Sequence, residues 1–191
     1  SLRMDAKIEW AAEAARRIHA AYDRVPRKLA DDGALHRFMV DECDFALEHA
    51  DGSFMDHLHF CSEYTALHLP SASPRVMLLH SIMGVGTNCF PMALEKLPTL
   101  RSLVRDDEMA LIQAFPSVLR LLVQGELLTD LEAALAAAGA ARLTTELDGL
   151  RCHRLLDNAP LSLAAPELWT MLNLQLIHLV DFLPVAAWQR T

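Results

Sequence analysis

The sequence has little of what marks several common classes of small protein. It contains 7 glycines in 191 residues, and a chain this poor in glycine but rich in alanine and leucine favours helices over sheets. Its four cysteines, Cys43, Cys61, Cys89 and Cys152, form no C-x-x-C pair, which excludes a zinc ribbon and a dithiol redox motif. We expect no signal peptide before the domain, and therefore free thiols in the reducing environment of the cytoplasm.

Positive charge and uninterrupted apolar runs are also scarce. The chain has 17 Lys and Arg against 25 Asp and Glu, and its basic residues are dispersed, so it lacks the electrostatic footprint of a nucleic-acid-binding protein. The apolar run from Leu127 to Ala141 is interrupted by Asp130 and Glu132, which is too polar for a membrane span. The sequence therefore predicts neither a nucleic-acid partner nor a membrane partner.

Length and hydrophobic periodicity predict one all-α domain covering residues 1–191. Apolar residues recur at helical spacing between capping and breaking residues. The predicted helices cover residues 5–22, 34–49, 53–69, 74–83, 99–105, 106–124, 129–138 and 166–183. Pro116 is expected to kink or break the helix at 106–124.

One stretch, residues 143–156, departs from the helical pattern. Asp148-Gly149 separates two short runs that contain apolar residues, and this dipeptide is the strongest short signal for a two-residue hairpin turn. A small β-hairpin near residues 143–156 is therefore predicted on the helical body. A continuous helix over the same residues is the competing interpretation.

Two histidines, His57 and His80, organise the segment from residue 48 to residue 91. Ser53 and Asp56 resemble a capping box, which places His57 one turn inside a helix. His57 lies beside the apolar face of that helix, formed by Phe54, Leu58, Cys61 and Leu67. Ser73-Pro74 is typical of the start of the next helix, in which His80 closes an apolar run.

A histidine inside each of two consecutive helices is the arrangement from which a helical bundle builds an internal metal site. Two buried, hydrogen-bonded imidazoles produce the same sequence pattern. For one pair without further ligands, that simpler interpretation is the favoured one.

The segments HADGSFMDHL and LLHSIMGVGTNCF, which contain these two histidines, resemble a little-characterised branch of the HD-domain superfamily. Members of that branch carry an HS-x-x-F-x-x-HL segment and then a GLFHS-x-YGT segment. In ordinary HD proteins the corresponding positions hold a metal-binding His and then the His-Asp pair that names the fold. This chain departs from the pattern at Ser81, where the aspartate would stand, and at Met83, where the branch has tyrosine.

The resemblance implies an HD-like helical bundle with metal ligands beyond His57 and His80. A histidine recurs in the family pattern at the position of His49, which makes it a further candidate ligand. HD proteins take their final ligand, an aspartate, from a late helix. Aligning the last helix by its apolar pattern places His178 near that position and Asp181 one turn beyond.

These histidines suit a single divalent ion such as Zn, Fe or Mn. Two ions are less favoured, because Ser81 brings no negative charge to hold two cations together. Asp181 would be a fourth ligand or would orient His178.

The resemblance implies a metal-dependent hydrolase of a small phosphate ester, in which the ion lowers the pKa of a bound water and Ser81 hydrogen-bonds that water. One alternative is a non-catalytic HD scaffold that binds a small ligand or a protein partner. Another is iron-dependent, oxygenase-like activity, since some HD relatives with two irons oxidise small alcohols. The loop from Gly84 to Thr87 either presents amides to an anion or only ends a helix. An exposed Trp10, Trp169 or Trp188 would indicate a homo-oligomer.

Overall fold

The computed structural model of this chain describes residues 33–43, 48–49, 52–84, 92–139 and 148–182. The side chains of residues 48, 49, 52–54, 56, 138, 181 and 182 lie outside that description. The predicted helix at 5–22, the capping box at Ser53 and Asp56 and the loop beyond Gly84 are therefore not tested. Within the described residues helices dominate, as predicted, and two small two-stranded sheets accompany them.

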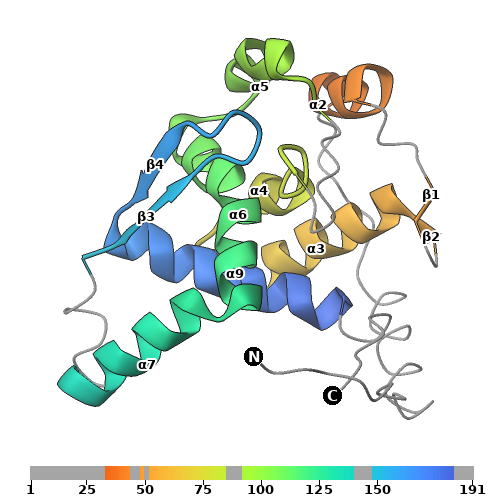
Figure 1. Cartoon of the computed structure of the whole chain (residues 1–191). Coiled ribbons are helices and arrows are strands. Elements are labelled where there is room, and N and C mark those ends of the chain that lie inside the picture. Colours follow the sequence, from red (N-terminus) through yellow and green to blue (C-terminus); the bar gives the residue numbers. More distant parts are fainter. Residues whose placement is uncertain (1–32, 44–47, 50–51, 85–91, 140–147, 183–191) are drawn as a thin grey trace.

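Three long helices frame the body: α3 (Phe54–His68), α6 (Asp106–Gln124) and α9 (Ala165–Phe182). In Figure 1, α9 crosses the lower part of the molecule, and α3 and α6 both pack against it. The bounds of α6 match the prediction, because three acidic residues occupy its first turn and Gly125, at φ 86°, ends it in the left-handed region.

The shorter helices agree less well with their predicted bounds. They are α2 (Gly33–Arg37), the π-helix η1 (Phe38–Glu42), α4 (Pro74–Leu78), the 3-10 helix η2 (Leu94–Lys96), α5 (Leu97–Leu103) and α7 (Glu126–Ala138). The predicted helix at 34–49 is wrong at its end, because β1 (Glu48–His49) pairs antiparallel with β2 (Gly52–Ser53). Strand pairing there replaces the helical hydrogen bonds.

Pro116 does not end α6, which continues for eight more residues to Gln124. Hydrogen bonds with α9 and β3 (Leu150–His153) stabilise the turn of α6 that contains Pro116. Gln175 Nε2 on α9 donates to the Phe115 carbonyl at 3.0 Å, and the Ser117 hydroxyl donates to the His153 carbonyl. These bonds hold α6 at the point where proline removes a helical hydrogen bond.

The described residues contain a hairpin whose first strand, β3, falls within the second strand of the predicted one. β3 (Leu150–His153) pairs antiparallel with β4 (Pro160–Leu163), whereas the predicted first strand, 143–147, lies outside the described residues. The turn is closed by Arg154, whose guanidinium donates to Asp157 at 2.6 and 2.8 Å. This ion-paired turn, rather than Asp148-Gly149, therefore joins the observed strands.

Gly149 makes a close backbone contact with β4. Its φ is 115°, and a Cβ built there would lie 2.1 Å from the Leu163 carbonyl oxygen. Glycine is needed because the β4 backbone approaches closely. The predicted turn from residues 143–147 through Asp148-Gly149 is not tested.

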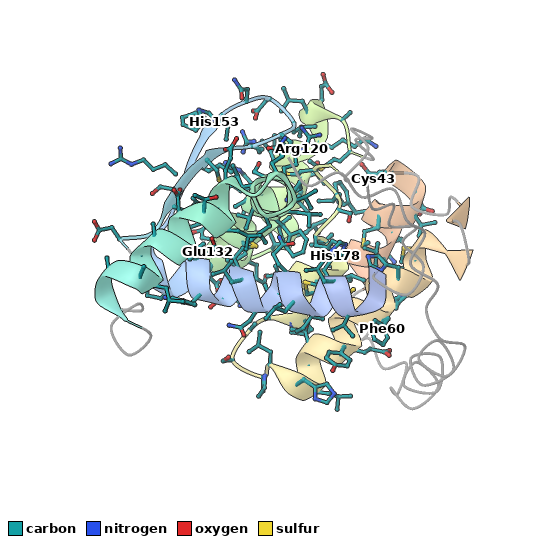
Figure 2. All side chains as sticks on the ribbon, turned by 60° about the horizontal axis from the view of Figure 1, so that its bottom comes forward. Cys43, Phe60, Arg120, Glu132, His153 and His178 are labelled. Carbon is teal, nitrogen blue, oxygen red and sulfur yellow. The ribbon has the colours of Figure 1, made fainter. Side chains whose placement is uncertain are left out.

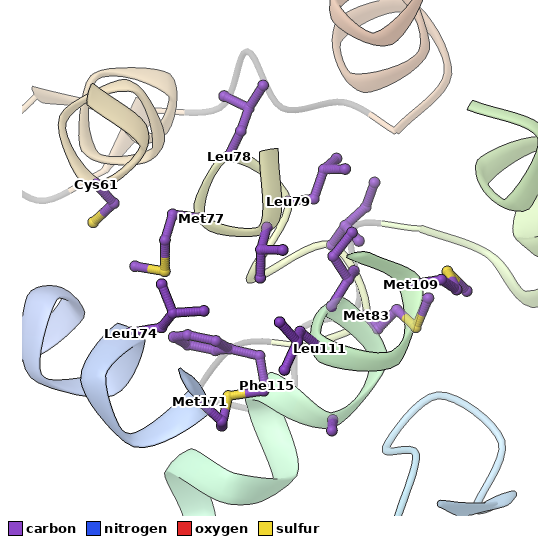
Figure 3. Packing of buried hydrophobic residues seen from close by; sticks show 14 of the residues in the cluster. Cys61, Met77, Leu78, Leu79, Met83, Met109, Leu111, Phe115, Met171 and Leu174 are labelled. Carbon is purple, nitrogen blue, oxygen red and sulfur yellow. The ribbon is translucent and has the colours of Figure 1, made fainter. Parts of the chain in front are cut away.

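The core lies where α3, α4, α6 and α9 meet. Figure 3 shows side chains from these four helices pointing toward one another: Cys61, Met77, Phe115 and Leu174. Each is at most 1% exposed. Leu67, predicted for the apolar face of α3, is 54% exposed. Thr65 is buried instead, with its hydroxyl donating to the Cys61 carbonyl at 2.7 Å.

Other expectations about the surface and the thiols can be compared with the described residues. There, Cys43, Cys61 and Cys152 are free thiols, as predicted, and Trp169 is half-buried. In the same residues no single helix has the length and apolarity to cross a membrane, and α6 with α7 meets that test only as a pair bent by 75°.

A buried carboxylate joins the start of α4 to the start of α6. Glu108 is 1% exposed and accepts hydrogen bonds from the Ser73 hydroxyl at 2.6 Å and from the Arg105 backbone N–H at 2.9 Å. The Arg105 guanidinium lies 2.8 Å and that of Arg75 3.6 Å from the same carboxylate. Ser73 also caps α4, as predicted, by accepting the Arg75 N–H. This network fixes the start of the segment that leads to His80.

Removing this carboxylate should destabilise the fold. We expect Glu108→Ala to lower the free energy of unfolding by about 2–3 kcal/mol, because the Ser73 hydroxyl and two guanidinium groups lose a charged acceptor. Urea denaturation measures this loss. Asp107→Ala is the matched control: Asp107 is exposed and ion-pairs with Arg105, so its loss should cost less than about 1 kcal/mol. Equal losses for the two variants would contradict the role assigned to Glu108.

Candidate metal centre

Three histidines from separate elements meet inside the molecule. His57 lies in the first turn of α3, His80 follows α4, and His178 lies near the end of α9. One potential ligand nitrogen from each ring lies within 4.8 Å of the other two. Figure 2 shows His178 on the side of α9 that faces the body of the protein. The predicted meeting of these three residues is therefore observed, whereas the side chain of His49, in β1, lies outside the described part of the chain.

The three rings are close and mutually tilted. Their centroids are 4.9–5.3 Å apart, with interplanar angles of 68–76°. The shortest approach is between the Nε2 atoms of His57 and His80, at 3.1 Å. His80 is 1% and His178 8% exposed, while His57 is half-buried. The cluster is therefore enclosed, with its contact to solvent on the His57 side.

His80 is not helical, contrary to the prediction of a helix at 74–83. α4 ends at Leu78, and the ring Nδ1 of His80 donates to the Met77 carbonyl at 2.6 Å. A continuing helix would give that carbonyl to the Ser81 N–H. Tight turns follow, with hydrogen bonds from Ile82 to Leu79 at 3.0 Å and from Gly84 to Ser81 at 3.2 Å.

Neighbouring groups orient the rings of His80 and His57. A carbonyl only accepts, so the hydrogen of neutral His80 lies on Nδ1 and its lone pair lies on Nε2. Nδ1 of His57 lies 3.9 Å from Sγ of Cys61, one turn later on α3. Both rings therefore turn Nε2 toward the same space, which is the arrangement that a shared ion requires.

Burial keeps the inner rings neutral. Desolvation lowers the pKa of His80 to about 3, with repulsion from His178 adding to the shift and the Met77 carbonyl opposing it. Desolvation, followed by repulsion from His57, lowers the pKa of His178 to about 3. Both lone pairs are thus available at neutral pH, as metal binding requires. Burial also raises the pKa of the Cys61 thiol, which stays protonated.

The donor set fits one borderline divalent ion. With Zn–N bonds of about 2.05 Å, the 3.1 Å separation of two nitrogens gives an N–metal–N angle of about 100°, close to tetrahedral. The third nitrogen lies within 4.8 Å of the other two, against about 3.3 Å in a tetrahedral site, so it would need to move by up to roughly 1.5 Å. Among the described side chains no carboxylate joins this group, so it does not resemble the oxygen-rich sites of Mg or Ca.

The structure describes the other predicted site residues only in part. Ser81 is 6% exposed and follows His80 in the turn. Gly84, at φ 149°, begins the glycine loop, whose remaining residues lie outside the described part. Asp181 lies in the last turn of α9, but its side chain is not described. Its predicted role near His178 stays a prediction.

Sequence reasoning missed two residues beside the rings. Cys61 was assigned only to the apolar face, although its spacing of four residues from His57 on one helix was a usable signal. Phe115 packs with its ring centroid 4.8 Å from that of His80 and 5.6 Å from that of His178. No local pattern marks Phe115 as part of the site.

We compared the chain with protein-family models, curated proteins and solved structures. No protein-family model, no curated protein and no solved structure matches the chain. Evidence about its function therefore comes from the site itself.

The neutral imidazoles predict how stability depends on pH once metal is removed by a chelator. Since burial lowers two pKa values from 6.5 to about 3, the unfolded chain binds more protons than the native protein between these values. Stability should be full above pH 6.5 and fall with pH, by roughly 2 kcal/mol from pH 6 to pH 5 for the two rings together.

Urea denaturation at several pH values measures this slope. The double variant His80→Asn and His178→Asn should flatten it, whereas His153→Asn, at an exposed position on β3, should not. A slope unchanged in the double variant would show that these rings titrate normally in the native state.

Proposed function

We propose that this protein is an HD-like hydrolase that uses one divalent ion, held by His57, His80 and His178, to cleave a small phosphate ester. The observation that supports the proposal is the approach of three ligand nitrogens in an enclosed cluster. Three imidazoles and an open position are a donor set that zinc hydrolytic centres use. The resemblance of the segments around His57 and His80 to HD proteins agrees with this chemistry.

An ion bound by these residues would supply a water molecule with a pKa lowered toward neutrality. The imidazoles themselves carry no charge, so they leave the charge of the ion uncompensated and favour an anionic substrate. Phe115 and Met77 line the inner side of the cluster and exclude bulk water there. His57, which is half-buried, marks the side from which substrate and solvent would arrive.

Ser81 gives specific support to a second candidate, a non-catalytic HD-like scaffold. It stands where HD enzymes have the aspartate, and a serine hydroxyl cannot bridge two ions. In that case the cluster would bind a metal or a small ligand without turnover. The same histidines can also bind Fe(II). Oxidation of a substrate with added Fe(II), instead of hydrolysis, would indicate oxygenase-like activity.

Metal content tests the first step of the proposal. Protein purified without an affinity tag should bind one equivalent of Zn or Mn, measured by elemental analysis, and His80→Ala should lose it. A free ion concentration of 100 Kd should raise the wild-type melting temperature by about 5–10 °C. His153→Ala, at an exposed strand position, is the control and should behave like wild type. Failure of the wild type to bind any of the ions tested would contradict the proposal.

Turnover tests the second step. A screen of small phosphate esters, including nucleotides, with added Zn, Mn or Fe should reveal hydrolysis that a chelator abolishes. His57→Ala and His178→Ala should each remove this activity while leaving the helical circular dichroism spectrum in place. Stoichiometric metal binding without turnover would favour the scaffold.

A further inference from the structure

The contact between His57 and His80 requires a hydrogen atom between their Nε2 atoms, which lie 3.1 Å apart. Two lone pairs facing each other at this distance would repel, so one ring must donate. A neutral imidazole has one N–H, and His80 already uses its own to donate from Nδ1 to the Met77 carbonyl at 2.6 Å. The donor in this contact is therefore His57, through Nε2–H.

This assignment determines what happens on the other side of the His57 ring. With its hydrogen on Nε2, His57 has a lone pair on Nδ1, which lies 3.9 Å from the Cys61 sulfur. A thiol is a weak donor and a weak acceptor, so Cys61 S–H can donate to this lone pair. The result is a one-way chain of hydrogen bonds from Cys61 to His57, from His57 to His80, and from His80 to the Met77 carbonyl.

We propose that this chain holds the metal-free site together, and that binding of a divalent ion reverses the tautomer of His57, with Cys61 changing from donor to acceptor. The second half of this proposal rests on the function proposed above. The first half concerns the metal-free protein and stands without it.

The proton balance of the change is simple. A shared ion needs the lone pairs of both Nε2 atoms, and His80, whose Nε2 lone pair accepts from His57 in the metal-free state, already has the required tautomer. In His57 the Nε2–H bond breaks, its electron pair forms the bond to the metal, and a proton is bound at Nδ1 by exchange with solvent. Cys61 then turns its own hydrogen away and accepts Nδ1–H at sulfur. The imidazole stays neutral in both states.

Cys61 is thus a positioning residue for a metal ligand. A group that donates hydrogen to the ligand in one state and accepts from it in the other supports both tautomers. A carboxylate at this place would accept only, and would fix the metal-binding tautomer permanently. Alanine can neither donate nor accept at this position, whereas serine can do both.

The test is nitrogen NMR of protein with ¹⁵N-labelled histidine, recorded without metal and with one equivalent of zinc. We expect His57 to carry its hydrogen on Nε2 without metal and on Nδ1 with zinc. His80 should carry its hydrogen on Nδ1 in both states, which makes it an internal control. A metal-free His57 protonated at Nδ1, or zinc bound to His57 through Nδ1, would overturn the inference.

Variants of Cys61 provide a second measurement. Cys61→Ala should weaken zinc binding by about 10- to 100-fold, the usual effect of losing a group that orients a metal ligand, and Cys61→Ser should restore affinity. Equal affinity for wild type and the alanine variant would refute the positioning role. If wild-type protein binds no zinc, the proposed function and the tautomer reversal both fail, and the metal-free spectrum alone decides whether the chain of hydrogen bonds exists.

Discussion

The hydrogen bond from the His80 ring to the Met77 carbonyl is the constraint on which the site depends. At 2.6 Å it joins a side chain to the backbone three residues earlier, and it uses a carbonyl that a longer helix would need. α4 therefore ends after five residues, and the chain turns so that His80 is buried beside α3, α6 and α9. The same bond places the ring hydrogen on Nδ1. One interaction thus sets both the position of the ring and the atom it offers.

Desolvation links the stability of this cluster to its chemistry. A charged imidazole in the core would cost much more than a neutral one, so the protein keeps the inner rings neutral, and the Met77 carbonyl accepts the ring hydrogen of His80. Neutral rings are also the form that binds metal. The apolar surroundings that impose this state, including Phe115 and Leu174, are supplied by α6 and α9. The environment that stabilises the fold is therefore the one that prepares the ligands.

Local sequence signals predicted the elements whose intrinsic secondary-structure preference agrees with the way they pack in the fold. The acidic first turn marked the start of α6, and Ser73 marked the start of α4. His178 was a candidate only through the resemblance to HD proteins, with the apolar pattern of the last helix used to align it. The failures involve contacts between distant or unusual partners. The end of α4 depends on a ring-to-backbone bond, and burial of Thr65 in place of Leu67 depends on the packing around α3. No pattern within a short window contains these contacts.

The lack of negative charge in the histidine cluster determines how many divalent ions it can hold. The residue after His80 is Ser81, and among the described side chains no carboxylate joins the histidine cluster. Two divalent ions about 4 Å apart would repel each other by roughly 17 kcal/mol at an effective dielectric constant of 20. Neutral imidazoles and a hydroxyl offset little of this repulsion. A single ion avoids it and retains its full charge for a bound water or an anionic substrate. The lack of a carboxylate among the described side chains of the cluster therefore favours one ion over two at this site.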